Sequence, residues 1–237
     1  MPLTYTPLVP INIASIYQGP LPHRLAQCTP DTKAAIEAVA RDLAAMGFGI
    51  RLSDLFRSHE MQAQSHADFV EGRKKAFSPP PGESLHEAGR AMDIDLSSIG
   101  VTLARFWEIA KAHGFTPIID VPDAHRSESW HFDFRGSHGA VYDYVQAGKA
   151  GTMLAPYTQM AQSAILAIGV KLDKVPAQNV AFLQAGLIRL GFDPGRIDGV
   201  HGNRTSKALE AAGADLGDPI TWVSEALRAK FPAEYAV

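Results

Sequence analysis

Four residues in two short segments have the types and the spacing of a catalytic metal centre. His86 and Asp93 lie seven positions apart in Ser-Leu-His-Glu-Ala-Gly-Arg-Ala-Met-Asp, and Glu128 and His131 lie three apart in Glu-Ser-Trp-His. Together they supply two imidazoles and two carboxylates. A catalytic zinc site combines three protein ligands with an open position for water, and a general base acts beside it. The residue types therefore predict a zinc centre that activates water.

The pattern of the flanking residues predicts how these side chains meet. Residues 91–96 and 129–134 both alternate in the way that is typical of a strand. Because successive side chains of a strand point to opposite faces, Asp93 can face a cleft while its two neighbours enter a core. We expect two adjacent strands to present Asp93 and His131 side by side.

The two segments resemble the motifs of one family of zinc peptidases, S-x-H-x-x-G-x-A-x-D followed by E-x-W-H. This chain matches them at Ser84, His86, Gly89, Ala91, Asp93, Glu128, Trp130 and His131. The family contains D-alanyl-D-alanine carboxypeptidases of the VanY type, VanX-type dipeptidases and phage L-alanyl-D-glutamate endopeptidases. The resemblance implies that His86, Asp93 and His131 hold Zn²⁺ and that Glu128 is the general base.

An upstream segment, Phe56 to Gln62, resembles the family's Y-R-S-x-x-x-Q sequence, with Phe56 in place of the usual Tyr. The resemblance implies that Arg57 and Gln62 approach the substrate, where they and Ser84 orient the peptide and stabilise the oxyanion. A guanidinium can bind a carboxylate through two parallel hydrogen bonds. Arg57 is therefore predicted to lie beside a carboxylate or carbonyl of the substrate, with a role in both binding and catalysis.

Composition is that of an ordinary soluble globular protein. The 237 residues are 46% hydrophobic and 20% charged, and the net charge of −3 gives no strong field for nucleic acid or anionic lipid. Cys28 is the only cysteine, so an intrachain disulfide is excluded and a buried thiol is expected. No apolar run approaches the ~18 residues of a membrane span, and no signal peptide is visible. We expect an extracytoplasmic protein of the periplasm or cell wall, or a phage-encoded lysin.

The periodic segments predict an α+β fold, with helices packed on a small, mainly antiparallel sheet that carries the zinc site. Helices are expected over 30–46, 60–72 and 102–113, and strands at 50–52, 91–96, 116–121 and 129–134. We expect the peptidase domain to span residues 1–150, with its motif core at 45–136.

A small all-α domain is expected at residues 177–237, after a helical linker at 151–176. Residues 180–205 resemble the peptidoglycan-binding-domain-1 repeat, in which a helix ending in Leu-Gly-Phe is followed by Ile-Asp-Gly and a second helix. The resemblance implies binding to cell-wall glycan or peptide. The alternative is a domain that only stiffens or dimerises the enzyme.

Single positions in this repeat have predicted roles. Gly191 is expected to end the first helix, and Gly199 and Gly202 to adopt positive φ in tight turns. Thr205 is expected to cap the second helix, and Ile197 and Val200 to enter the core between the helices. A further helix is expected from Pro219 to Phe231.

The resemblance thus implies a zinc-dependent peptidase that hydrolyses peptidoglycan stem peptides, most simply a D,D-carboxypeptidase of the VanY type. An L-alanyl-D-glutamate endopeptidase of the phage type is the alternative, because the sequence does not show how loops 73–83 and 122–127 close the site. A third possibility is a non-catalytic wall-binding protein that retains zinc. Glu128 argues against it, because a structural zinc site needs no base.

Overall fold

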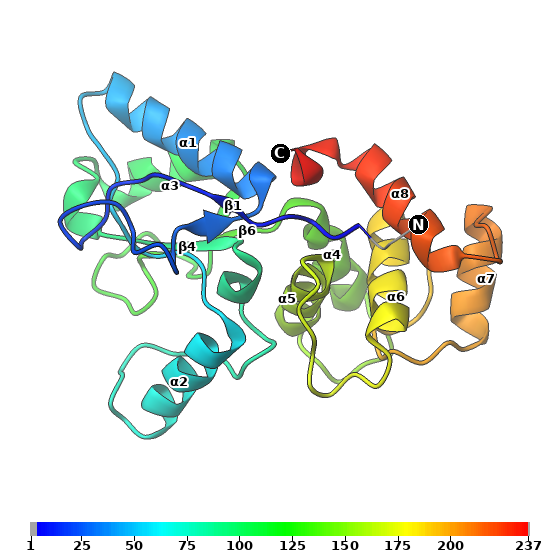
Figure 1. The fold of residues 1–237 in the computed structure, drawn as a ribbon. Coiled ribbons are helices and arrows are strands. Elements are labelled where there is room, and N and C mark those ends of the chain that lie inside the picture. Colours follow the sequence, from blue (N-terminus) through cyan, green and yellow to red (C-terminus); the bar gives the residue numbers. More distant parts are fainter. Residues whose placement is uncertain (1–3, 237) are drawn as a thin grey trace. The chain divides into compact units, whose positions relative to one another are not determined.

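The computed structural model describes residues 4–236, which form two compact units (Figure 1). The N-terminal unit is Leu8–Gly136, and the C-terminal unit joins residues 4–7 to Ser137–Ala236. The sequence predicted a domain boundary at 150 and a separate linker at 151–176, whereas the compact units divide after Gly136. The two helices between Gly136 and residue 176 pack against each other and against the next helix of the C-terminal unit, so they belong to its core.

A four-stranded antiparallel sheet organises the N-terminal unit, in the order β3-β4-β6-β5. Its strands are β3 (Leu52–Asp54), β4 (Ala91–Ile94), β6 (His131–Phe134) and β5 (Phe115–Pro117). A separate pair is formed by β1 (Val9–Pro10) and β2 (Gln27–Cys28). The register of β4 and β6 sets Asp93 directly opposite His131. The predicted side-by-side placement of these two residues is therefore confirmed.

Three helices and two 3₁₀ turns complete this unit: α1 (Pro30–Ala45), α2 (His59–Val70), η1 (Leu85–Ala88), η2 (Leu96–Ser98) and α3 (Leu103–Ala112). Pro30 starts α1 at its first turn, where a missing N–H costs nothing. Figure 1 shows α1 and α3 on the same side of the strands and α2 apart from both. Ile36 of α1, Phe106 of α3 and Phe132 of β6 are fully buried in one core with Met92 of β4.

The predicted strand at 116–121 is shorter in the structure than expected. Strand β5 ends at Pro117, whereas the sequence pattern predicted a strand from 116 to 121. Proline lacks the N–H that would continue the ladder. Beyond it Ile118 and Val121 are exposed rather than packed into the core.

The C-terminal unit is helical, as predicted, so the α+β class with a small all-α domain is confirmed. Its elements are η3 (Gly136–His138), α4 (Gly139–Gln146), α5 (Pro156–Ala167), α6 (Gln178–Leu190), α7 (Asn203–Ala212), α8 (Pro219–Lys230) and η4 (Pro232–Tyr235). Residues 4–7 are tied to it where Thr6 N donates to Ala167 O at 2.8 Å. No described helix has both the length and the apolar character that crossing a bilayer requires.

Three predictions for the turn between α6 and α7 are wrong. Gly202 has a φ of −106°, and α7 begins directly after it, so Thr205 lies inside the helix and does not cap it. The Thr205 hydroxyl is buried and donates to Pro194 O instead. Val200 is 58% exposed, whereas Ile197 is buried as expected.

Two glycines of this turn behave as predicted. Gly191 ends α6 with a φ of 105°, and Gly199 has a φ of 71°. A Cβ at Gly199 would lie 2.9 Å from the carbonyl oxygen of Ala177, so only glycine fits there. Gln184 of α6 holds the turn, since its Oε1 accepts from the N–H groups of Asp198 and Gly199 at 3.0 Å each.

Candidate metal centre

Three donor atoms converge in the N-terminal unit, from His86 of η1, Asp93 of β4 and His131 of β6. Asp93 Oδ1 lies 2.9 Å from His131 Nδ1 and 3.3 Å from His86 Nε2, and the two nitrogens are 3.3 Å apart. A tetrahedral zinc ion with bonds of about 2.1 Å separates its ligand atoms by roughly 3.4 Å. The donor types and their spacing therefore fit Zn²⁺.

Hydrogen bonds on the far side of each ring aim the imidazoles. His86 Nδ1 lies 2.7 Å from the carbonyl oxygen of Leu55, and His131 Nε2 lies 2.9 Å from Asp133 Oδ1. Both partners accept, so each ring carries its proton there and leaves its other nitrogen free for a metal. Asp133 is fully buried and thus has a fixed position.

The charges in the cluster favour a bound cation. Burial lowers the pKa of His131, but Asp133 and Asp93 outweigh this effect and raise the pKa to about 10. Burial raises the pKa of Asp93, yet His86 and His131 hold it well below its usual range. The carboxylates therefore stabilise positive charge at the point where the three donor atoms meet.

The short turn that carries His86 has its own supports. Ser84 is the N-cap of η1, and its hydroxyl accepts from His86 N at 3.3 Å. The Glu87 carboxylate accepts from Gly82 N at 2.9 Å. Gly89 ends the turn with a φ of 62°, and a Cβ there would lie 2.8 Å from Cys28 Cα. Close packing against Cys28 therefore explains why the motif has a glycine at this position.

Arg57 reaches the centre but is held by protein groups. Its Nε donates to Asp54 Oδ2 at 2.6 Å, its Nη1 to Gln62 Oε1 at 3.2 Å and its Nη2 to Asp93 Oδ2 at 3.4 Å. Burial lowers the pKa of Arg57, but Asp54 and Asp93 raise it above its usual value. A two-pronged contact with a substrate carboxylate would therefore have to compete with Asp54.

Gln62 and Ser84 hold parts of the protein together. Gln62 is fully buried, and its Nε2 donates to Pro79 O at 2.7 Å, which ties α2 to the loop before η1. Ser84 is buried as the cap of η1. The structure thus shows both as positioning residues, and their contact with a substrate stays a prediction.

Glu128 lies beside the donor cluster and outside it. It is half-buried, and it interacts electrostatically with His131, Asp93 and His86. Burial raises its pKa, which makes it a stronger base than an exposed carboxylate. Its φ of 66° is uncommon for a residue other than glycine, and such strain clusters at functional sites.

Two of the supporting residues were missed from the sequence. Asp133 follows His131 by two positions in the same strand, so the strand period alone places both on one face. The sequence therefore contained enough information to predict Asp133 as a neighbour of His131. It contained no such information for Asp54, because its contact with Arg57 depends on the turn between β3 and α2.

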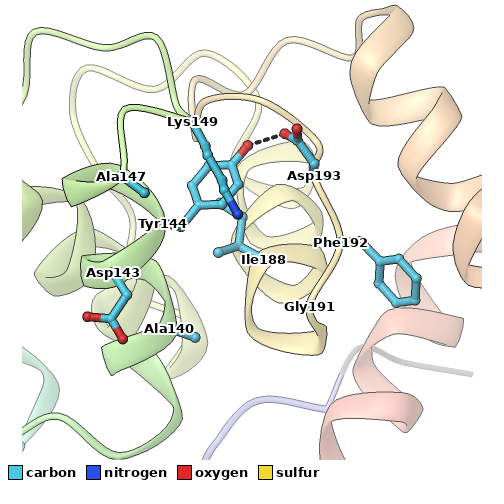
Figure 2. Close-up of a pocket in the computed structure, with 9 residues that line it drawn as sticks. All are labelled: Ala140, Asp143, Tyr144, Ala147, Lys149, Ile188, Gly191, Phe192 and Asp193. Atoms are coloured by element: carbon cyan, nitrogen blue, oxygen red, sulfur yellow. Dashed lines mark hydrogen bonds between the residues drawn. The ribbon is translucent and has the colours of Figure 1, made fainter.

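Several hollows of about 330 to 460 Å³ occur in the described part of the chain, and two of them bear on the candidate site and on the C-terminal unit. The first, which we call the Arg57 groove, has about 330 Å³, with Asp54, Arg57 and Lys74 among its lining residues. Arg57 links it to the cluster, because its Nη2 donates to Asp93 Oδ2. The second has about 460 Å³ and lies in the C-terminal unit between α4 and the end of α6. Figure 2 shows Tyr144 in this second pocket with its hydroxyl directed at Asp193, to which it donates a hydrogen bond.

The comparisons with known proteins give one family match. Residues 176–217 match the family model of a putative peptidoglycan binding domain. They coincide with α6, α7 and the turn between them, where the sequence resemblance was found. No curated protein matches the chain.

Several solved structures are similar to part of the chain. The LdcB LD-carboxypeptidase is 20% identical with a TM-score of 0.42, over 56% of this chain and 71% of that one. DacB from Streptococcus pneumoniae D39 is 22% identical with a TM-score of 0.37, over 57% and 80%. The vancomycin-resistance D,D-dipeptidase VanXYg, in complex with a D-Ala-D-Ala phosphinate analogue, is 20% identical with a TM-score of 0.39, over 64% and 63%. Since all three TM-scores are below 0.5, the function is inferred from the site residues and the matched domain.

Proposed function

We propose that this chain is a zinc-dependent peptidase that hydrolyses peptidoglycan stem peptides, most simply as a D,D-carboxypeptidase of the VanY type. The observation that carries the proposal is the triangle of His86, Asp93 and His131 donor atoms with the carboxylate of Glu128 beside it. A zinc ion bound there would lower the pKa of water to ~7 and polarise a carbonyl group. A site that only stabilised the fold would have no use for a further carboxylate with a raised pKa.

The residues around the donors supply the rest of the chemistry. Glu128 accepts the proton of the attacking water and passes it to the leaving amine. Asp133 and Leu55 O keep the two imidazoles in the orientation that a metal requires. Arg57, fixed by Asp54 and Gln62, contributes a positive charge that stabilises the oxyanion.

The substrate class is supported by the matched domain and by the sequence motifs. Residues 176–217 match a putative peptidoglycan binding domain, which would hold the enzyme on the cell wall. The protein would then act outside the cytoplasm, in the periplasm or wall, or be released as a phage lysin. The L-alanyl-D-glutamate endopeptidase is the second candidate, because Asp54 already occupies the side of Arg57 that would read a terminal carboxylate.

The test combines metal content with turnover. The purified protein should contain about one zinc per chain, and His131→Ala should lose it, as elemental analysis after dialysis would show. Glu128→Gln should keep the zinc and the fold, yet cleave a soluble stem peptide ~10²–10⁴-fold more slowly. Full activity of the Gln variant, or activity unaffected by a chelator, would refute the proposal. Zinc binding without any cleavage of stem peptides would favour the alternative of a non-catalytic wall-binding protein.

A further inference from the structure

The Arg57 groove has a cationic side chain whose hydrogen-bonding capacity is largely unused. The groove lies between β3 and α2, and the loop after α2 contributes Lys74 to its wall. Lys74 N donates to Asp68 O at 2.9 Å, which fixes the backbone at the end of α2. Lys74 is half-buried and lines the groove, and its Nζ donates to Ser65, another residue of the groove wall.

Two other charged side chains of the groove, Arg57 and Asp68, already form ion pairs within the protein. Arg57 pairs with Asp54 and Asp93, and Asp68 pairs with Arg73 at 2.7 Å. Within residues 4–236, Lys74 Nζ has one hydrogen-bond partner, Ser65 Oγ at 2.9 Å, and no carboxylate within ion-pair distance. An ammonium group has three donors. Two of them are therefore available to a ligand in the groove.

Lys74 also lies close enough to the candidate metal centre to interact electrostatically with Asp93 and Glu128. Burial lowers the pKa of Lys74, Arg57 lowers it further, and Asp93, Asp54 and Glu128 oppose both effects. The interaction with Glu128 is mutual. A substrate that reaches from the donor cluster into the groove would thus bring its polar groups past this side chain.

We propose that Lys74 binds a carboxylate of the substrate and so selects the peptides that the site accepts. The inference rests on the proposed peptidase function and names the residue that reads substrate charge. A half-buried ammonium that gains an anionic partner forms a charge-assisted hydrogen bond, which is stronger than a neutral one. Stem peptides offer at least two such carboxylates. One is at the C-terminus and another is on the D-glutamate residue.

The test measures binding, so that it does not depend on turnover. The probe is a synthetic stem pentapeptide ending in D-alanyl-D-alanine, in three forms: unmodified, amidated at the C-terminus, and amidated at the D-glutamate carboxylate. Calorimetry gives Kd for each form with zinc-loaded Glu128→Gln protein, alone and combined with Lys74→Gln. Lys74→Arg, which keeps the charge, and Lys75→Gln, which removes the charge of the exposed next residue, are the matched controls.

We expect Lys74→Gln to raise Kd about tenfold or more for the unmodified peptide. The effect should vanish for the one form that lacks the partner carboxylate, and Lys75→Gln should leave every Kd unchanged. Loss of the effect on C-terminal amidation would assign a carboxypeptidase, and loss on amidation of D-glutamate an endopeptidase. Equal effects on all three peptides, or none, would overturn the role of Lys74 while leaving the peptidase proposal intact. If wild-type protein neither binds nor cleaves any form, the proposed function fails and this inference fails with it.

Discussion

At the scale of single residues, the site depends on which atoms remain free after internal hydrogen bonding. His86 and His131 each use one ring nitrogen on a protein acceptor and turn the other toward Asp93. The sequence motifs predicted that these residues form the site. The alternation of the strands predicted that Asp93 and His131 lie side by side. The hydrogen bond from the Arg57 guanidinium to Asp54 could not be predicted. Asp54 belongs to no motif, and the turn after β3 brings the two side chains together.

Arg57→Lys should lower kcat/KM by about 10- to 100-fold, which corresponds to ~1.5–3 kcal/mol. Lysine keeps the charge but cannot bridge Asp54, Gln62 and Asp93 at once. Since Asp54 occupies one side of the guanidinium, we expect the same loss for peptides with a free and an amidated C-terminus. Kinetics on both peptides form a double-mutant cycle. A coupling energy well above zero would show that Arg57 itself reads the terminal carboxylate.

The buried thiol of Cys28 should make the folded protein less stable as the pH rises above 9. Burial raises the pKa of its thiol to about 12, with smaller opposing effects from nearby charges. Between pH 9 and about 12 the unfolded thiol is ionised while the folded one keeps its proton. The free energy of unfolding should therefore fall by about 1.4 kcal/mol per pH unit in that window. Urea unfolding of wild type and Cys28→Ala at several pH values checks this, and equal slopes for the two proteins would contradict it.

At the scale of elements, local signals located the helices well and the turns less well. Pro30 starts α1 and Gly191 ends α6, as the capping rules predict. The turn between α6 and α7 is different, because Gln184 binds it from the middle of a helix and Thr205 is drawn into the core. These bonds of Gln184 join residues fourteen or more positions apart. Local patterns do not contain that information.

Gly89→Ala should destabilise the N-terminal unit by ~2–4 kcal/mol, because the new Cβ meets the backbone of Cys28 at a φ that alanine disfavours. The displacement would move η1 and so weaken zinc binding through His86. Gly72→Ala is the matched control: its φ of +74° imposes the same conformational strain, but no atom lies within 4 Å of the added Cβ. Urea unfolding and zinc titration of both variants separate the two effects. Equal losses in both would mean that contact with Cys28 is unimportant.

At the scale of the whole molecule, the proposed chemistry and the proposed wall binding belong to different units. Every proposed site residue lies in Leu8–Gly136, and the segment that matches the putative peptidoglycan binding domain lies in the other unit. The sequence predicted two domains with a boundary at 150, whereas the compact units divide after Gly136. The helices α4 and α5 lack any motif, and only their packing with α6 assigns them.

A protein shortened to residues 8–136 should bind zinc and cleave a soluble stem peptide at a rate close to that of the full chain. It should bind insoluble sacculi more weakly, because tethering through a second site raises the local concentration of substrate. Pelleting with sacculi measures the second effect and peptide hydrolysis the first. Equal pelleting of the two proteins would contradict a targeting role for the C-terminal unit.

The C-terminal unit includes the earliest described residues as well as the last ones. Thr4 N donates to Ser224 Oγ, and Thr6 N donates to Ala167 O. On the ribosome these first residues emerge long before their partners, since residue 236 follows residue 136 by 100 positions. At roughly 5–20 residues per second, the N-terminal unit is fully synthesised about 5–20 seconds before the helical unit can be completed. Until residues 167 and 224 have been synthesised, Thr6 and Thr4 lack the hydrogen-bond partners that they have in the folded protein, so this segment can join its unit only late in translation.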